Sequence, residues 1–121
     1  MPPLKHIQRQ AKLAALTLEI VRRHMQLGIT AEELECLLAF VVDDWQYYPN
    51  FTDFIPHKIA RQLGISYPTS ERIFNSLIKK GIITREKIDD PIHQWGRDDH
   101  YEYIVKPLLD KLEELDKVEN I

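Results

Sequence analysis

The stretch IARQLGISYPTSERI, residues 59–73, contains the signals that decide the fold of this chain. Ala60 is small enough to let two helices cross closely, and Gly64 readily adopts the positive φ that ends a helix. Ile65 supplies an apolar side chain for the corner, and Ser66 is a residue type that caps the start of a helix. The stretch therefore predicts two helices joined by a tight turn.

The second of these helices is expected over residues 66–80, after a short one over residues 56–63, and its two sides differ. At ~100° per residue, one side is apolar and consists of Ile73, Phe74, Leu77 and Ile78. The opposite side has no large apolar residue and consists of Pro68, Arg72, Asn75, Ser76 and Lys79. Such a helix buries one side and offers the other to a partner.

The remaining segments predict a helix before this pair, and a hairpin and a last helix after it. Thr30 and Glu33 have the spacing of a capping box, which predicts a helix that reaches about residue 46. After Gly81 the apolar residues alternate, so strands are expected over 82–88 and 100–105, joined by a polar loop. The last helix is expected from residue 106 onward. The sequence thus predicts a mainly α fold with a small β-hairpin.

A long first helix is expected over residues 4–27, before Gly28, and it has two apolar stripes about 150° apart. One stripe consists of Leu4, Ile7, Ala11, Ala14, Leu18, Val21 and Met25, and the other of Leu13, Leu16, Ile20 and Leu27. A core of this size covers only one side of the helix, so the other side is expected to contact a second copy of the chain. The residues expected at this homodimer contact are Leu13, Leu16, Ile20, Leu108, Leu112 and Leu115.

With its helical pair, its exit through Gly81 and its strand–loop–strand, the chain resembles a winged helix-turn-helix DNA-binding domain, specifically a MarR-like transcriptional regulator. The resemblance covers residues 30–105 and implies a single winged-helix domain over 1–121. In that domain, residues 1–28 form an N-terminal dimerisation helix and residues 106–121 a C-terminal helix. Ser70 departs from the branched apolar residue usual in the family, which predicts looser packing there. The acidic wing loop, with Asp89, Asp90, Asp98 and Asp99, also departs, because it suits phosphate poorly.

The resemblance implies that the helix over 66–80 enters the major groove of double-stranded DNA, where each base pair shows a distinct pattern of hydrogen-bonding groups. Arg72 and Asn75 are the expected base readers, because their side chains match guanine and adenine edges in pairs of hydrogen bonds. The full set of expected DNA-binding residues is Lys58, Ser66, Tyr67, Thr69, Arg72, Asn75, Ser76, Lys79, Arg85, Lys87 and Arg97.

The charge of the chain is unevenly distributed along its 121 residues, although the net charge is only −3. Residues 56–88 carry seven basic and two acidic side chains, whereas residues 28–55 carry six acidic ones and no basic one. Local potential, not net charge, decides whether a phosphate backbone is attracted. The basic block includes the helix that the resemblance assigns to DNA.

Composition favours a soluble, cytoplasmic protein and argues against an enzyme. Cys36 is the only cysteine, so disulfides within the chain and multi-cysteine zinc sites are excluded. Apolar runs are too short for a membrane span, and no catalytic triad or glycine-rich phosphate loop is present. A loose metal site at His93 and His100 is disfavoured, because polar loops of this kind are usually only solvated. No cofactor, metal or membrane contact is expected.

Two other functions are compatible with the same residues. The winged core also resembles DNA-binding modules of plasmid or phage replication-initiation and partition proteins, and the acidic wing suits a winged-helix protein-interaction module. A further expectation concerns a small aromatic effector, which would be bound by aromatic residues around the loop after the second helix. These residues are Trp45, Tyr47, Tyr48, Phe51 and Phe54.

Overall fold

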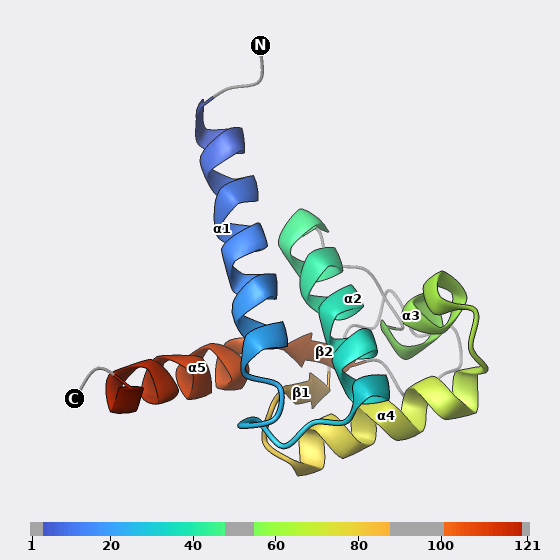
Figure 1. Ribbon diagram of the computed structural model, residues 1–121. Coiled ribbons are helices and arrows are strands. Elements are labelled where there is room, and N and C mark those ends of the chain that lie inside the picture. The colour runs from blue at the N-terminus through green and yellow to red at the C-terminus, as the bar shows by residue number, and fades with distance from the viewer. Residues whose placement is uncertain (1–3, 48–54, 88–100, 120–121) are drawn as a thin grey trace.

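The computed structural model describes residues 4–47, 55–87 and 101–119, and the side chains of residues 7–43 within the first range. In these ranges the fold is mainly helical with one two-stranded antiparallel hairpin, as the sequence predicts (Figure 1). The elements in chain order are α1 (Leu4–Arg22), α2 (Ala31–Tyr47), α3 (Ile55–Leu63), α4 (Tyr67–Lys79), β1 (Thr84–Lys87), β2 (Tyr101–Ile104) and α5 (Lys106–Glu119).

No described helix combines the length and the apolar character that a membrane crossing requires.

The turn between α3 and α4 forms as the local sequence predicts. Gly64 has a φ of 68°, and the amide of Ile65 donates to the carbonyl of Ala60 at 3.0 Å, which closes the end of α3. Ser66 then caps α4, because its Oγ accepts a hydrogen bond from the amide of Thr69 at 3.3 Å. These two local devices place α3 and α4 against each other with only three residues between them.

Helix α1 ends earlier than predicted, at Arg22 instead of residue 27. From His24 onward the chain tightens, and the His24 amide donates to the Val21 carbonyl three residues back at 3.4 Å. Gly28 still ends this segment with a φ of 73°, and the amide of Ile29 donates to the His24 carbonyl at 3.2 Å. The predicted stop is therefore correct, but a run of turns separates it from the helix.

Helix α2 starts with the predicted capping box and carries the centre of the core. The Thr30 amide donates to Glu33 at 2.8 Å, and the Glu33 amide donates to the Thr30 hydroxyl at 3.2 Å. Farther along α2, the rings of Phe40, Phe74 of α4 and Tyr103 of β2 all meet edge to face. The ring centroids of the three pairs are 5.7–6.4 Å apart. This aromatic group fixes the hairpin to the helical body.

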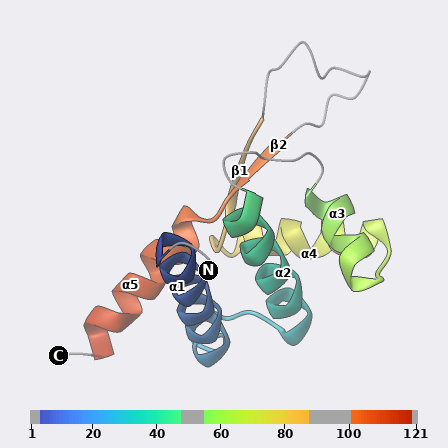
Figure 2. The ribbon, with the colours of Figure 1, turned by 90° about the horizontal axis from the view of Figure 1, so that it is seen from above.

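The hairpin strands are shorter than predicted because Ile82 and Ile83 are buried in the core instead of paired in the sheet. Pairing begins at Thr84, opposite Ile104, and continues through Arg85 opposite Tyr103. Lys87 faces Tyr101, so basic residues of β1 and tyrosines of β2 share one side of the hairpin. Figure 2 shows the hairpin projecting from the helical body.

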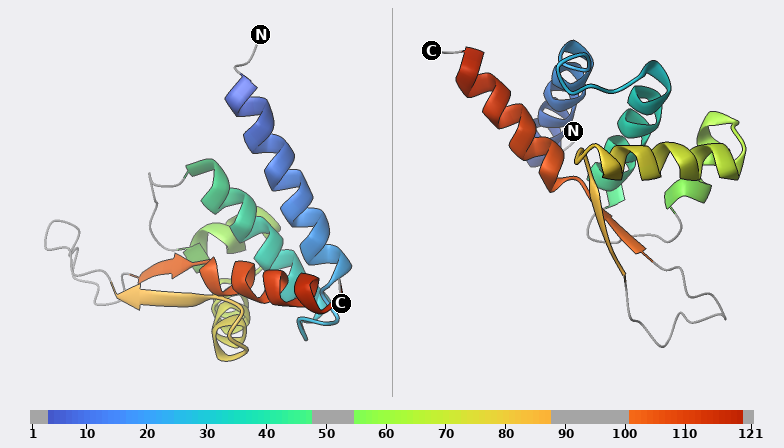
Figure 3. Two further views of the ribbon diagram at one scale, coloured as in Figure 1. Left: turned by 90° about the vertical axis from the view of Figure 1, so that its left-hand side faces the viewer. Right: turned by 90° about the horizontal axis from the view of Figure 1, so that it is seen from below.

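Helices α1 and α5 lie together at one side of the molecule, away from α3 (Figures 2 and 3). The first half of α1 rises beyond α2 (Figure 3), and residues 7–12 are exposed on every side of the helix. Leu13 is the first buried residue of α1, and the stripe that it begins packs into the core of the same chain.

Most of the residues expected at the homodimer contact pack within the single chain instead. Leu13, Ile20, Leu108 and Leu112 are buried within the single chain, and Leu16 packs against the same core. Leu115, also expected there, is half-buried. The stripe left exposed is the opposite one, in which Leu18 is 70 % exposed; its other large members are Ile7, Val21 and Met25. Periodicity identified two apolar stripes, but only packing decides which of them the core covers.

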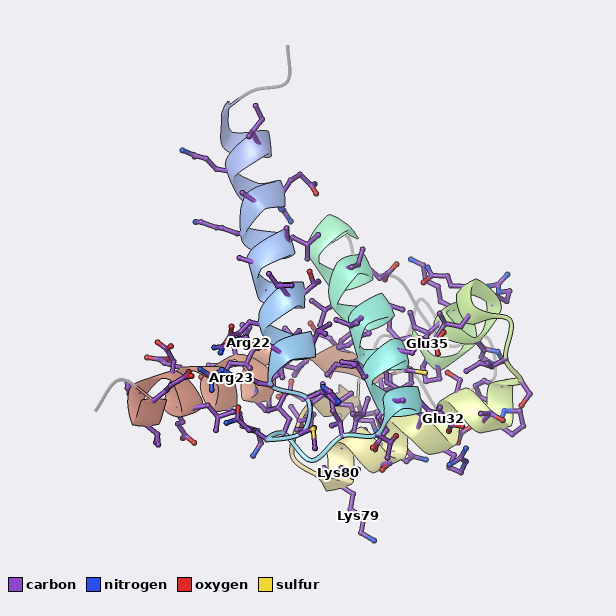
Figure 4. The ribbon with its side chains drawn as sticks, in the orientation of Figure 1. Arg22, Arg23, Glu32, Glu35, Lys79 and Lys80 are labelled. Atoms are coloured by element: carbon purple, nitrogen blue, oxygen red, sulfur yellow. The ribbon has the colours of Figure 1, made fainter. Side chains whose placement is uncertain are left out.

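Arg23 joins the end of α1 to the end of α5. Its side chain is 2 % exposed and donates to Glu19, to Glu119 and, at 3.2 Å, to Gln26. Figure 4 shows Arg22 and Arg23 where the two helices meet. Hydrogen bonds from Arg22 and Arg23 lower the pKa of Glu119, and those from the same two arginines lower the pKa of Glu19. This charged group sets how α5 lies against α1.

Candidate nucleic-acid interface

Helix α4 exposes the polar side that the sequence predicts. Its buried side consists of Ser70, Ile73, Phe74 and Leu77. Pro68, Arg72, Asn75 and Lys79 are exposed on the other side. Figure 1 shows α4 along the lower edge of the molecule, where no described helix lies below it. Figure 4 shows Lys79 pointing away from the body.

Ser70 does not loosen the packing of α4, contrary to the expectation from the family pattern. Its side chain is fully buried, and its hydroxyl donates to the carbonyl of Pro56 at 2.7 Å. The hydrogen bond satisfies a buried hydroxyl and joins α4 to the first turn of α3. Ser70 thus makes a hydrogen bond where the family usually has an apolar contact.

Arg85 of β1 lies directly beside this polar side of α4. Its Nη1 is 3.4 Å from the Oδ1 of Asn75 and 3.5 Å from the hydroxyl of Tyr103, and its guanidinium lies 4.2 Å from the centre of the Tyr101 ring. The contact with Tyr103 raises the pKa of Arg85, which is charged at any physiological pH. Arg85 therefore links the hairpin to the exposed side of α4 at Asn75.

A cleft of about 220 Å³ separates the start of α4 from the hairpin. Its walls include His57, Tyr67, Glu71, Arg85, Tyr101 and Tyr103. The rings of His57 and Tyr67 stack with centroids 3.7 Å apart, which fixes the first turn of α4 against α3. Tyr67, expected to touch DNA, is thus an exposed residue with one ring face already covered.

Arg72 lies on the other flank of α4, beside the first turn of α2. Its Nη2 is 3.6 Å from the Oε2 of Glu32, and both side chains are more than two-thirds exposed. Exposed pairs of this kind contribute ~0–1 kcal/mol, so Arg72 stays available to another partner. Glu32 was not among the residues expected from the sequence, because no spacing rule relates it to a residue forty positions later.

Lys58, which was expected to contact phosphate, is paired with a carboxylate of the same chain. Its Nζ is 2.6 Å from Oδ1 of Asp43, which is almost completely buried in α2. A buried carboxylate needs a partner charge, and the half-buried Lys58 of α3 supplies one to Asp43 of α2. Sequence position placed it in the basic block, but the fold commits its charge to Asp43.

Ser76 also differs from the expectation, because its hydroxyl donates to Glu33 of α2 at 2.6 Å instead of facing outward. Lys80 donates to the same carboxylate at 2.5 Å and to the Gly28 carbonyl at 2.9 Å. Burial by itself raises the pKa of Glu33, but hydrogen bonds from Lys80, Ser76 and Thr30 outweigh it and lower the pKa to about 2. This group joins the start of α2 to the end of α4.

The remaining expected residues fall into three groups. Ser66 and Thr69 belong to the cap of α4, with their hydroxyl oxygens 2.8 Å apart. Lys87 is exposed at the end of β1. Arg97 and the acidic wing loop lie outside the described residues, and so do the side chains of the five aromatic residues expected to bind an effector.

No protein-family model matches the chain, and no curated protein matches it.

Proposed function

We propose that this protein is a winged helix-turn-helix DNA-binding protein, a dimeric transcriptional regulator of the MarR-like type. The observation that carries the proposal is the exposed side of α4, which presents Arg72, Asn75 and Lys79, together with the contact between Asn75 and Arg85 of β1. A helix at the edge of the molecule whose exposed side is basic and polar suits the major groove, which is wide enough to admit it. The hairpin beside it then takes the position of a wing.

In this proposal Arg72 acts by itself, whereas Asn75 and Arg85 act as a pair. Arg72 reads a base, because a guanidinium fork matches the O6 and N7 acceptors of guanine. Asn75 reaches the same groove, but its Oδ1 already accepts from Arg85, so the two side chains act on DNA together. Lys79 and Lys87 are exposed at the end of α4 and of β1, where they contact phosphates.

The dimer is proposed to form through the exposed stripe of α1. A helical segment exposed on every side, like residues 7–12, gains little stability unless another surface covers it. The first eighteen residues include Lys5, Arg9 and Lys12 and no acidic residue, whereas α5 is rich in Asp and Glu. Charge therefore favours α1 of one copy beside α5 of the other.

A gel-shift selection from a pool of random duplexes tests the proposal, with the full chain at moderate salt. The expected result is a short palindromic motif whose half-sites lie about one helical turn apart. Direct repeats would favour a replication-initiation or partition protein instead. The absence of any binding across the pool would overturn DNA binding and favour a protein-interaction module.

A further inference from the structure

The first turn of α2 places one acidic side chain at the edge of the proposed DNA surface. Glu33 faces inward and is held by Lys80, Ser76 and Thr30. Glu32 is left exposed, and its carboxylate lies 3.6 Å from the guanidinium of Arg72. Figure 4 shows Glu32 at the lower end of α2, next to α4.

This placement affects binding to phosphate differently from binding to a base. A phosphate that takes over Arg72 must draw it away from Glu32 and leave a carboxylate beside the negatively charged backbone. A guanine edge carries no net charge, and the guanidinium has five N–H donors, enough to contact guanine and Glu32 together. The ion pair with Glu32 therefore opposes a contact of Arg72 with phosphate more than a contact of Arg72 with guanine.

We infer that Glu32 is a specificity-determining residue, which positions Arg72 for guanine and disfavours its use on phosphates. The inference rests on the proposed function, because it requires that α4 enters DNA. Non-specific binding arises almost entirely from contacts with phosphates, so a residue that weakens those contacts raises the ratio of specific to non-specific affinity. Glu32 thus acts through Arg72 and does not itself have to touch DNA.

The test compares Glu32→Gln with Glu35→Gln, using the duplex selected by the wild-type protein and a scrambled duplex of equal length. Glu35 is an exposed residue of the same helix, and it lies beside Gln62 and Leu63 of α3 instead of Arg72. Both variants lose one negative charge, so they share the effect of the change in net charge. We expect Glu32→Gln to bind the scrambled duplex about two- to five-fold more tightly than Glu35→Gln does, and to lower the affinity ratio by a similar factor. Thermal unfolding of both variants checks that the fold is retained.

The same comparison in an Arg72→Ala background separates this role from a structural one. Without the guanidinium, Glu32→Gln and Glu35→Gln should have equal effects on both duplexes. Equal effects of the two variants already in the wild-type background would overturn the inference while leaving DNA binding in place. Failure of the wild-type protein to select any duplex would instead overturn the proposed function itself.

Discussion

The guanidinium of Arg85 on β1 lies 3.4 Å from the amide oxygen of Asn75 on α4, ten residues earlier in the chain. This contact joins the hairpin to the exposed side of the helix across the turn that follows Gly81. Tyr103 is buried against Phe40 and Phe74, and its hydroxyl lies 3.5 Å from Nη1 of Arg85. The position of the candidate base-contacting group thus depends on the aromatic core.

Asn75 and Arg85 should affect the same base positions. Because the Asn75 oxygen holds Arg85, Asn75→Ala and Arg85→Ala should relax the selected motif at the same one or two positions, and the double variant should add little. Arg72→Ala should relax a different position, by ~1–3 kcal/mol against the wrong base. Repeating the random-duplex selection with each variant measures this. Separate positions for Asn75 and Arg85 would show that Asn75 reads a base on its own.

Replacing Lys79 or Lys87 by alanine should weaken the binding of all DNA sequences about equally. Each exposed ammonium that neutralises a phosphate releases a counterion, so each replacement should reduce the salt dependence of log K by roughly one unit. Titrations of one duplex at several salt concentrations give this slope. A variant with an altered sequence preference and an unchanged slope would contradict the role.

Lys58→Ala should lower stability, in contrast to Lys79→Ala. It leaves the buried carboxylate of Asp43 without its partner charge, a change that costs on the order of 3 kcal/mol. The paired change Asp43→Asn with Lys58→Met should recover part of that loss, because it removes both charges. Urea unfolding of the three variants measures the difference. Equal stability of Lys58→Ala and Lys79→Ala would show that the Asp43–Lys58 pair does not stabilise the fold.

Glu33 should make the protein lose stability in acid. Its pKa falls from 4.5 to about 2 on folding, so the folded state favours the ionised carboxylate. The resulting stabilisation is complete above about pH 4.5 and is lost as the pH falls towards 2, for a total on the order of 3 kcal/mol. The free energy of unfolding of Glu33→Gln should therefore vary less over this range than that of the wild type. If the free energies of unfolding of the two proteins change with pH in parallel, this role of Glu33 is contradicted.

Leu18→Glu and Ile20→Glu should separate dimerisation from folding. Leu18 is exposed, so a charge there should give a folded monomer of about 14 kDa that binds DNA weakly. Ile20 is fully buried, so the same charge should unfold the chain instead. Sedimentation with circular dichroism distinguishes the two results. A Leu18→Glu variant that remains dimeric would place the contact elsewhere.

Sequence alone determined the parts of this fold that depend on neighbouring residues. The capping box of Thr30 and Glu33, the ends of the helices at Gly64 and Gly81 and the cap at Ser66 each involve atoms within about six residues. Their residue types are therefore sufficient to locate them. Apart from Ser76, the polar side of α4 was equally predictable, because helical spacing fixes which side chains lie together.

Tertiary structure alone decided which charges remain free and which apolar stripe is covered. Ser76 and Lys80 meet Glu33 across 43 and 47 residues, and Arg23 meets Glu119 across 96. No periodicity relates residues so far apart, because their meeting depends on how whole helices pack. For the same reason, the two stripes of α1 look equivalent along the chain, and only the packing of α1 on α2 buries Ile20 and leaves Leu18 exposed.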